Sequence, residues 1–261
     1  MKYFFDKDIQ IGHDTAITIG KFDGLHRGHM HLAGELQRIA AQNTLATVIL
    51  SFWPHPAQFF SGKGAHLILA RQEKIHLLEQ MGIDYYIEYP FTAAFAGMRP
   101  EDFVTDILVN KLCCRVLVVG QGYRFGAGGA GDVALLEKLG RQLGFATHVV
   151  NHVDSKDGKI SAADLRCSIV NGNLAKVKEL TGRDYFIMGQ VGLDKKIILC
   201  TNKLLPPCGT YITITHVDGE KFGSITKINE KFVVENHIVD FVGDMRGKTV
   251  CVDFIRRFEE N

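Results

Sequence analysis

The stretch that decides the fold is Gly20-Lys21-Phe22-Asp23-Gly24-Leu25-His26-Arg27-Gly28-His29. It joins the pattern of a buried strand at residues 16–20 to the pattern of an amphipathic helix. Its glycines let a backbone approach a ligand closely, and the N–H groups at the start of a helix favour an anion. His26 and His29 are three positions apart, so both side chains can reach one phosphate from the same helix end. The stretch therefore predicts a phosphate site, with surface histidines or metal ligands as the alternatives.

Outside this stretch, strand and helix patterns alternate. Apolar runs typical of buried strands cover residues 16–20, 46–52 and 115–120. Between them lie two amphipathic helix faces, formed by Leu32, Leu36, Ile39 and Ala40 and by Leu135, Leu136, Leu139 and Leu143. Such alternation predicts an α/β domain with a parallel sheet covered on both faces. Ligands bind such sheets at the carboxyl ends of the strands, so the chemistry is expected in the loops that follow them.

The pattern changes after about residue 182, where turn formers separate short β-rich runs. These runs cover residues 185–188, 210–217, 225–228, 232–234 and 249–255. Short strands with frequent turns predict a small antiparallel β-barrel or sandwich. We place the boundary near Arg183, which gives a first domain over residues 1–183 and a second over residues 184–261.

The amino-acid composition argues against some classes of binding partner for this protein. The 261 residues include 30 Lys and Arg against 29 Asp and Glu, so the net charge of +1 lacks the basic surplus typical of nucleic-acid binders. No apolar run approaches the roughly 20 residues that cross a bilayer, and the first residues do not resemble a signal peptide. The six cysteines form no C-x-x-C pair. We therefore expect a cytoplasmic protein with reduced thiols, no membrane partner and no nucleic-acid partner.

Several motifs resemble one known family. H-x-G-H at residues 26–29 is similar to the signature of the nucleotidylyltransferase superfamily, and the longer G-x-F-D-G-x-H-x-G-H resembles the first module of prokaryotic FAD synthetases, the bifunctional riboflavin kinase/FMN adenylyltransferases. Further stretches match that family in the same order, at residues 52–56, 119–126 with 131–132, 160–166 and 182–185. The resemblance covers the first domain from end to end and implies a Rossmann-like nucleotidylyltransferase fold.

The resemblance also implies a reaction and a set of site residues. AMP would pass from ATP, bound with Mg²⁺, to FMN, giving FAD and pyrophosphate, and no metal ligand is assigned to the protein. The residues that would stabilise charge on the transferred phosphate are His26, His29 and Arg166. The ATP-binding residues would be Gly20, Phe22, Asp23, Gly24, Gly28, Ser161 and Arg166. The flavin-binding residues would be Pro54, His55, Pro56, Tyr123, Arg124 and Phe125.

Three positions depart from the family pattern. Gly122 replaces an aspartate on the flavin side, and Ala162 and Ala163 replace two hydroxyl residues on the triphosphate side. Arg166 remains and can pair with a phosphate through two hydrogen bonds. A nearby G-x-G-x-x-G at residues 126–131 matches a dinucleotide fingerprint, but it begins several residues after the strand ends. We expect a glycine loop near the flavin or ATP there, rather than a nicotinamide site.

The second domain resembles a riboflavin kinase that has lost its ATP site. Residues 234–241 and 243–248 are similar to the kinase segment that holds the catalytic base, which would be Glu235. Cys200-Thr201-Asn202 occupies the place of the family's metal-binding threonine motif, and cysteine is a poor ligand for Mg²⁺. The glycine loop before it is short. We therefore expect no kinase activity. The alternatives are a bifunctional enzyme, in which Thr201 serves after a one-residue slip, and a non-catalytic binder of flavin or nucleotide.

Overall fold

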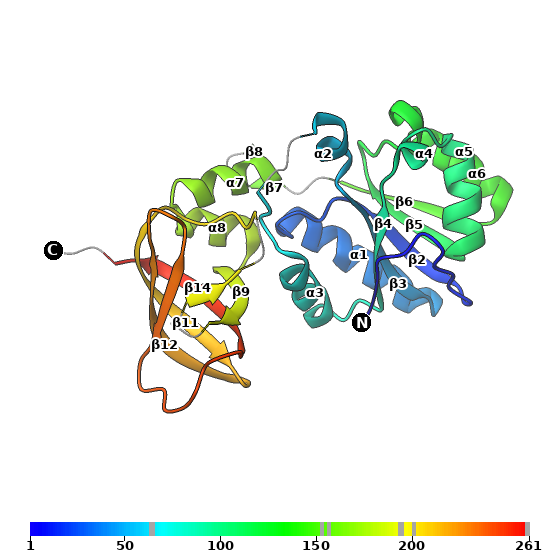
Figure 1. The fold of residues 1–261 in the computed structure, drawn as a ribbon. Helices are drawn as coiled ribbons and strands as arrows, with labels where there is room; N and C mark the ends of the chain where they lie inside the picture. The colour runs from blue at the N-terminus through cyan, green and yellow to red at the C-terminus, as the bar shows by residue number, and fades with distance from the viewer. Residues whose placement is uncertain (63–65, 152–153, 156–157, 193–195, 200–201, 259–261) are drawn as a thin grey trace. The chain divides into compact units, whose positions relative to one another are not determined.

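The computed structural model describes residues 1–62, 66–151, 154–155, 158–192, 196–199 and 202–258. Two compact units are present (Figure 1). The first unit comprises Met1–Phe22, Gly28–Gly64 and Ile75–Lys159, and the second comprises Asp23–Arg27, Ala65–Lys74 and Ile160–Asn261. Because each unit is assembled from separate stretches, a linear domain boundary at Arg183 stays a prediction.

The first unit is built on a six-stranded parallel sheet. In chain order its strands are β1 (Lys2–Phe4), β2 (Thr15–Ile19), β3 (Ala46–Trp53), β4 (Tyr85–Pro90), β5 (Cys114–Gly120) and β6 (Ala146–Val150). They lie side by side in the order β1-β4-β3-β2-β5-β6, and every neighbouring pair is parallel. The connections diverge at β2, which has β3 on one side and β5 on the other. The carboxyl ends of β2 and β5 therefore lie at a topological switch point, the usual ligand position in such sheets.

Helices and short turns join these strands. They are α1 (Arg27–Asn43), α2 (Pro56–Ser61), α3 (Arg71–Gln80), α4 (Ala93–Ala96), α5 (Pro100–Asp102), a π-helix (Phe103–Lys111), a 3₁₀ turn (Ala127–Gly129) and α6 (Val133–Leu143). A two-stranded hairpin, β7 (Asp154–Ser155) with β8 (Gly158–Lys159), follows β6. Figure 1 shows α1 on one side of the sheet and α5 and α6 on the other.

The core of this unit lies on both faces of the sheet. Ile17 and Ile19 face the cluster that contains the apolar residues of the π-helix and α6. Ala16 and Thr18 alternate with them on β2 and are also fully buried, as expected for a strand covered on both sides. On α1 the buried face consists of Ala33, Leu36, Ile39 and Ala40, while Leu32 is only half-buried. These features confirm the α/β sheet predicted from the alternating patterns.

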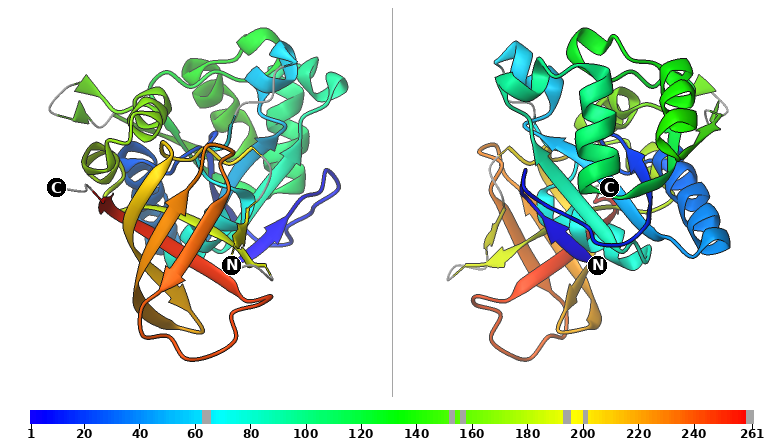
Figure 2. Two further views of the ribbon diagram at one scale, coloured as in Figure 1. Left: turned by 60° about the vertical axis from the view of Figure 1, so that its left-hand side comes forward. Right: turned by 90° about the vertical axis from the view of Figure 1, so that its right-hand side faces the viewer.

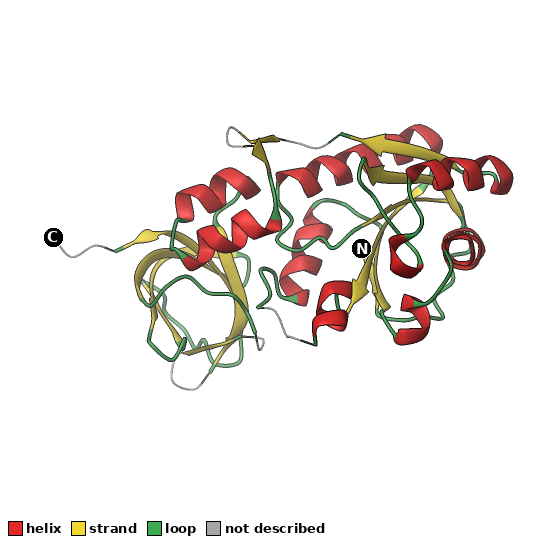
Figure 3. Ribbon diagram, turned by 90° about the horizontal axis from the view of Figure 1, so that it is seen from above, coloured by secondary structure: helices red, strands yellow, loops and turns green. Residues whose placement is uncertain are grey.

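The second unit contains two helices and a closed antiparallel barrel. The helices are α7 (Ala162–Val170) and α8 (Leu174–Thr181). The six strands are β9 (Tyr185–Val191), β10 (Lys196–Ile198), β11 (Gly209–Val217), β12 (Glu220–Ile228), β13 (Val234–Ile238) and β14 (Thr249–Arg257). They close in the order β10-β13-β12-β11-β14-β9, and the barrel is seen end-on in Figure 3 and from the side in the left view of Figure 2. The predicted antiparallel barrel is confirmed.

One predicted strand is misplaced. The run at residues 232–234 contributes only Val234, where β13 begins. Phe232 is exposed and has a φ of 57°, which is incompatible with a strand. The side-chain oxygen of Asn229 accepts hydrogen bonds from the backbone N–H groups of Lys231 and Val233, which folds this segment into a turn. Local hydrogen bonding therefore overrides the β propensity of the apolar run.

Candidate active site

The glycine-histidine turn after β2 has an unusual backbone. Phe22, Gly24 and Leu25 have φ angles of 45°, 80° and 42°, in the left-handed region that favours glycine. The side chains of Phe22 and Leu25 are fully buried, which holds these two residues in a costly conformation. A Cβ atom at Gly24 would lie 2.5 Å from Leu165 Cδ2, so both the left-handed backbone and the close side chain favour glycine there. Contact of Gly20, Gly24 or Gly28 with ATP stays a prediction.

The two histidines of the turn have different surroundings. His26 lies just before α1 and is buried, whereas His29 is half-buried in the first turn of α1, with its ring centroid 5.0 Å from that of Phe22. Burial lowers the pKa of His26 below its ordinary value, the charge of Arg183 lowers it further, and the Asp23 carboxylate opposes both. The imidazole of His26 is therefore neutral at neutral pH and offers one N–H donor.

The residues predicted on the triphosphate side lie in the second unit. Arg166 Nη2 donates to Asp23 Oδ2 at 3.1 Å, and Arg166 Nη1 donates to the carbonyl of His66. The structure thus brings Arg166 and Asp23 together as an ion pair. Ser161 is the N-cap of α7: its hydroxyl accepts from Asp164 N at 3.2 Å and donates to Asp164 Oδ2 at 2.6 Å. Ala162 and Ala163 are the first two residues of that helix.

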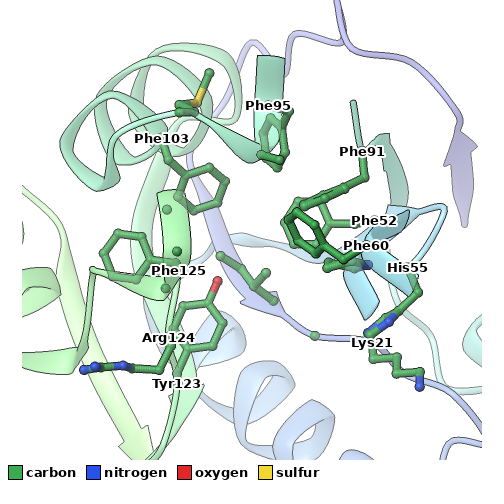
Figure 4. A pocket seen from close by; sticks show the side chains of 18 residues that line it. Lys21, Phe52, His55, Phe60, Phe91, Phe95, Phe103, Tyr123, Arg124 and Phe125 are labelled. Atoms are coloured by element: carbon green, nitrogen blue, oxygen red, sulfur yellow. The ribbon is translucent and has the colours of Figure 1, made fainter. Parts of the chain in front are cut away.

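An aromatic pocket of about 330 Å³ opens at the switch point of the sheet (Figure 4). Its aromatic lining residues are Phe52, Phe60, Phe91, Phe95, Phe103, Tyr123 and Phe125. In Figure 4, Phe52, Phe60 and Phe91 gather on one side of the pocket and Phe103, Tyr123 and Phe125 on the other. Lys21, His55 and Arg124 supply the basic groups of the lining. The lining residues that the structure describes include no carboxylate, so the pocket suits a flat aromatic ligand that carries negative charge.

The loop after β5 forms one wall of this pocket. The rings of Tyr123 and Phe125 are stacked at 5.8 Å with 12° between their planes, and Phe125 pairs with Gly131 in an antiparallel bridge. Gly126 has a φ of 72°, and a Cβ atom there would lie 2.5 Å from Pro100 Cγ. Gly126, Gly128 and Gly129 all line the pocket. The absence of a side chain at Gly126 therefore lets the chain pass close to Pro100 in a pocket wall.

Polar groups in this region have structural partners. Arg124 forms an ion pair with Asp132 at 3.4 Å, and Asp132 is also the N-cap of α6. His55 Nδ1 accepts from Ala57 N at 3.1 Å and caps α2. Burial raises the pKa of the Tyr123 hydroxyl, which therefore stays protonated at neutral pH. Gly122 is exposed, and a Cβ atom there would meet open space.

The pocket includes both predicted and unpredicted residues. Of the predicted flavin residues, it brings together His55, Pro56, Tyr123, Arg124 and Phe125, whereas Pro54 does not line it. Six other lining residues were not predicted from the sequence: Lys21, Phe52, Phe60, Phe91, Phe95 and Phe103. A usable pattern existed only for Lys21 and Phe52, which belong to the motifs at residues 20–29 and 52–56. The other four stand at scattered positions that only the folded chain brings together.

The barrel has a separate pocket of about 400 Å³, whose lining is more polar. It is lined by residues at the end of β9, on β13 and in the loop that follows β13, including Asn236, His237, Phe241 and Arg246. Glu235 is exposed and pairs in register with Lys196 of β10. Asn202 has a φ of 67°, and its carbonyl accepts from Leu67 N at 2.6 Å. Cys200 and Thr201 lie outside the described residues, so their predicted roles stay predictions.

Within the described part of the chain, no three His, Cys, Asp or Glu side chains come together as a metal site. Among the helices that the structure describes, none has the length and apolar character needed to span a bilayer.

Comparison with known proteins shows which family the chain belongs to. The parallel sheet, with a glycine-histidine turn after β2 and a pocket at its carboxyl edge, has the architecture of an α/β protein that binds ligands at a switch point. The FAD synthetase family model matches residues 8–164, and the riboflavin kinase family model matches residues 182–261. The chain therefore belongs to the FAD synthetase family, as its motifs predicted, and carries the riboflavin kinase domain found in the bifunctional members.

Individual relatives agree with this assignment. The bifunctional riboflavin kinase/FMN adenylyltransferase of Escherichia coli K12 is 30% identical over 255 residues, covering 90% of this chain and 82% of that protein. The FAD synthetase of Listeria monocytogenes is 35% identical over 207 residues, covering 76% of this chain and 80% of that protein. A crystal structure titled as a macrolide-efflux protein from Streptococcus pneumoniae has a TM-score of 0.85 over 99% of this chain and 91% of that one. At 22% identity, it shows the fold alone.

Proposed function

We propose that the protein is an FMN adenylyltransferase, which transfers AMP from ATP to FMN and releases pyrophosphate. The observation that carries this proposal is the aromatic pocket at the switch point, where aromatic rings enclose the space and Lys21 and Arg124 supply positive charge. An isoalloxazine ring would stack on the aromatic walls, and basic groups would attract the phosphate of FMN. Membership of the FAD synthetase family supports this assignment.

The proposed chemistry needs little covalent help from the protein. A phosphate oxygen of FMN attacks the α-phosphorus of ATP, and the bond from that phosphorus to the bridging oxygen of pyrophosphate breaks. The FMN phosphate is already ionised at neutral pH, so no strong general base is required. His26 and His29 would donate hydrogen bonds to the transferred phosphate, and Arg166 and the Ser161 hydroxyl would hold the triphosphate. Mg²⁺ would enter with ATP as part of the substrate.

For the barrel we propose a retained fold without kinase activity. The substitution at Cys200 removes the hard oxygen ligand that Mg²⁺ prefers. A bifunctional enzyme is the second candidate, favoured by the match of residues 182–261 to the riboflavin kinase family and by the barrel pocket of about 400 Å³.

We further propose a cytoplasmic location and a domain boundary at Arg183. Its partners would be the small molecules FMN and ATP, and it would bind neither nucleic acid nor a membrane.

The test is product formation from two flavins. Purified protein is incubated with ATP and Mg²⁺ and either FMN or riboflavin, and the products are separated by chromatography. We expect FAD from FMN and no product from riboflavin. His29→Gln should lower FAD formation strongly, whereas His31→Gln, an exposed histidine of the same helix, should not. FMN and FAD from riboflavin would establish the bifunctional enzyme. No FAD in either reaction would refute the proposal.

A further inference from the structure

The side chain of Arg183 holds the backbone of the turn that carries His26. Arg183 Nη1 donates to the carbonyl of Leu25 at 2.8 Å, and Arg183 Nη2 donates to the carbonyl of Gly24 at 2.6 Å. Arg183 and the turn residues Asp23–Arg27 belong to the same compact unit. Both acceptors lie in left-handed backbone, where Leu25 adopts a conformation that non-glycine residues rarely keep. Two charge-assisted hydrogen bonds therefore support the turn at Leu25, one of its two non-glycine residues with a left-handed backbone.

Arg183 is itself firmly anchored. Its carbonyl accepts from Thr181 Oγ1 at 2.8 Å, and its backbone N–H donates to the same oxygen at 3.3 Å. Its guanidinium lies 6.0 Å from the ring centroid of Phe186. Burial lowers the pKa of Arg183 to about 10, so the group stays positively charged at neutral pH. The side chain is thus a fixed cation that presents its donors to two adjacent carbonyls.

We propose that Arg183 is a positioning residue for adenylyl transfer, which fixes the Gly24–Leu25 carbonyls and through them the imidazole of His26. This inference rests on the proposed function and adds a residue whose role is to hold the turn that carries His26. His26 follows Leu25 directly, so any rotation of the Leu25 peptide moves the imidazole. Geometry at a phosphoryl-transfer site is decisive, because charge stabilisation depends on donors placed in advance.

The charge of Arg183 also acts on His26. Two charged groups are known to act on this imidazole: Arg183 lowers its pKa, and Asp23 raises it. Asp23 is paired with Arg166, and burial lowers the pKa further. The positive charge of Arg183 repels a proton on the imidazole. Removing that charge should therefore raise the pKa of His26. His26 would then become protonated at a higher pH than in the unmodified protein.

The experiment compares four variants of the full chain. Arg183→Met removes the charge and the donors, Arg183→Lys keeps the charge, and Arg183→Gln keeps an amide donor without the charge. Arg257→Met is the matched control, because Arg257 also donates to a backbone carbonyl, that of Cys208, in the same unit. For each variant we measure kcat and KM for FMN, thermal unfolding, and the NMR titration of the His26 imidazole, assigned with His26→Gln.

We expect Arg183→Met to lower kcat by about 10- to 100-fold with little change in KM for FMN. The pKa of His26 should rise in Arg183→Met and in Arg183→Gln. Arg183→Lys should recover part of kcat and leave the pKa of His26 near that of the unmodified protein. Arg257→Met should change neither quantity. If Arg183→Met does not fold, Arg183→Lys and Arg183→Gln are compared with each other, because only the first keeps the charge.

Two results would overturn the inference. The first is a kcat for Arg183→Met equal to that of Arg257→Met. The second is an equal loss of kcat and thermal stability in all three Arg183 variants with an unmoved pKa of His26, which would make Arg183 only structural. If the unmodified protein forms no FAD, the proposed function fails. The His26 titration then decides alone whether Arg183 acts on the imidazole.

Discussion

At the scale of single residues, Phe60 contributes a ring to the aromatic pocket while 71% of the residue is exposed. Its ring lies 6.0 Å from that of Phe91 and 5.4 Å from that of Phe59. A residue so exposed adds little to the stability of the folded chain, because only buried apolar surface contributes strongly. Its place at the pocket therefore points to ligand binding.

We predict that Phe60→Ala raises KM for FMN by about twofold to tenfold, the loss expected for one aromatic contact, with little change in stability. Steady-state kinetics and fluorescence titration of FMN measure the effect. Phe258→Ala, which removes an exposed ring that does not line the pocket, is the control. Equal KM values for the two variants would show that Phe60 does not contact the flavin.

At the scale of helices and strands, the amino-acid sequence predicts the central strands well. The runs at residues 16–20, 46–52 and 115–120 differ from β2, β3 and β5 by no more than one residue at either end. Strands buried on both faces leave continuous apolar runs, which need no knowledge of the partner strand. Phe232 shows where this prediction of strands from apolar runs fails. The Asn229 side chain accepts hydrogen bonds from the backbone there, and the apolar run forms a turn instead of a strand.

The site could be predicted only where its residues are close in sequence. The turn at residues 20–29 was identified because glycines and histidines stand together, and the loop at residues 123–126 was identified by its resemblance to a motif of the FAD synthetase family. Phe91, Phe95 and Phe103 join the pocket because β4 ends beside it, α4 follows and the π-helix begins there, which no local pattern encodes. The bonds from Arg183 to the turn span 158 and 159 positions, so only the folded chain reveals them.

Helix α7 gives its cap residue two possible roles. Ser161 caps α7 in the structure, and we propose that the same hydroxyl meets the triphosphate. Ser161→Ala should cost about 1 kcal/mol of stability, as should Asn173→Ala at the cap of α8. Only Ser161→Ala should also raise KM for ATP, by about tenfold. Denaturant unfolding and steady-state kinetics separate the two effects. Equal KM values for ATP in both variants would leave Ser161 as a helix cap alone.

At the scale of the whole molecule, the second unit is assembled from three separate stretches of chain. Its stretch at residues 65–74 is tied to the barrel segment by a buried ion pair. Lys203 Nζ lies 2.7 Å from Glu73 Oε2, and both side chains are almost fully buried. Glu73 also accepts from the backbone N–H groups of Ala70 and Met188, and Lys203 donates to the carbonyl of Ile68. This network satisfies both charges, as a buried pair requires.

Breaking this pair on one side should destabilise the protein strongly. Glu73→Gln leaves the Lys203 ammonium buried without its counter-charge, and we predict a loss of about 3–5 kcal/mol in the free energy of unfolding. The double variant Glu73→Gln/Lys203→Met removes both charges and should lose less. Asp14→Asn, which breaks the exposed pair with Arg115, should cost no more than about 1 kcal/mol. Denaturant unfolding measures all three. A loss for Glu73→Gln no larger than that for Asp14→Asn would mean that backbone contacts alone hold residues 65–74 in this unit.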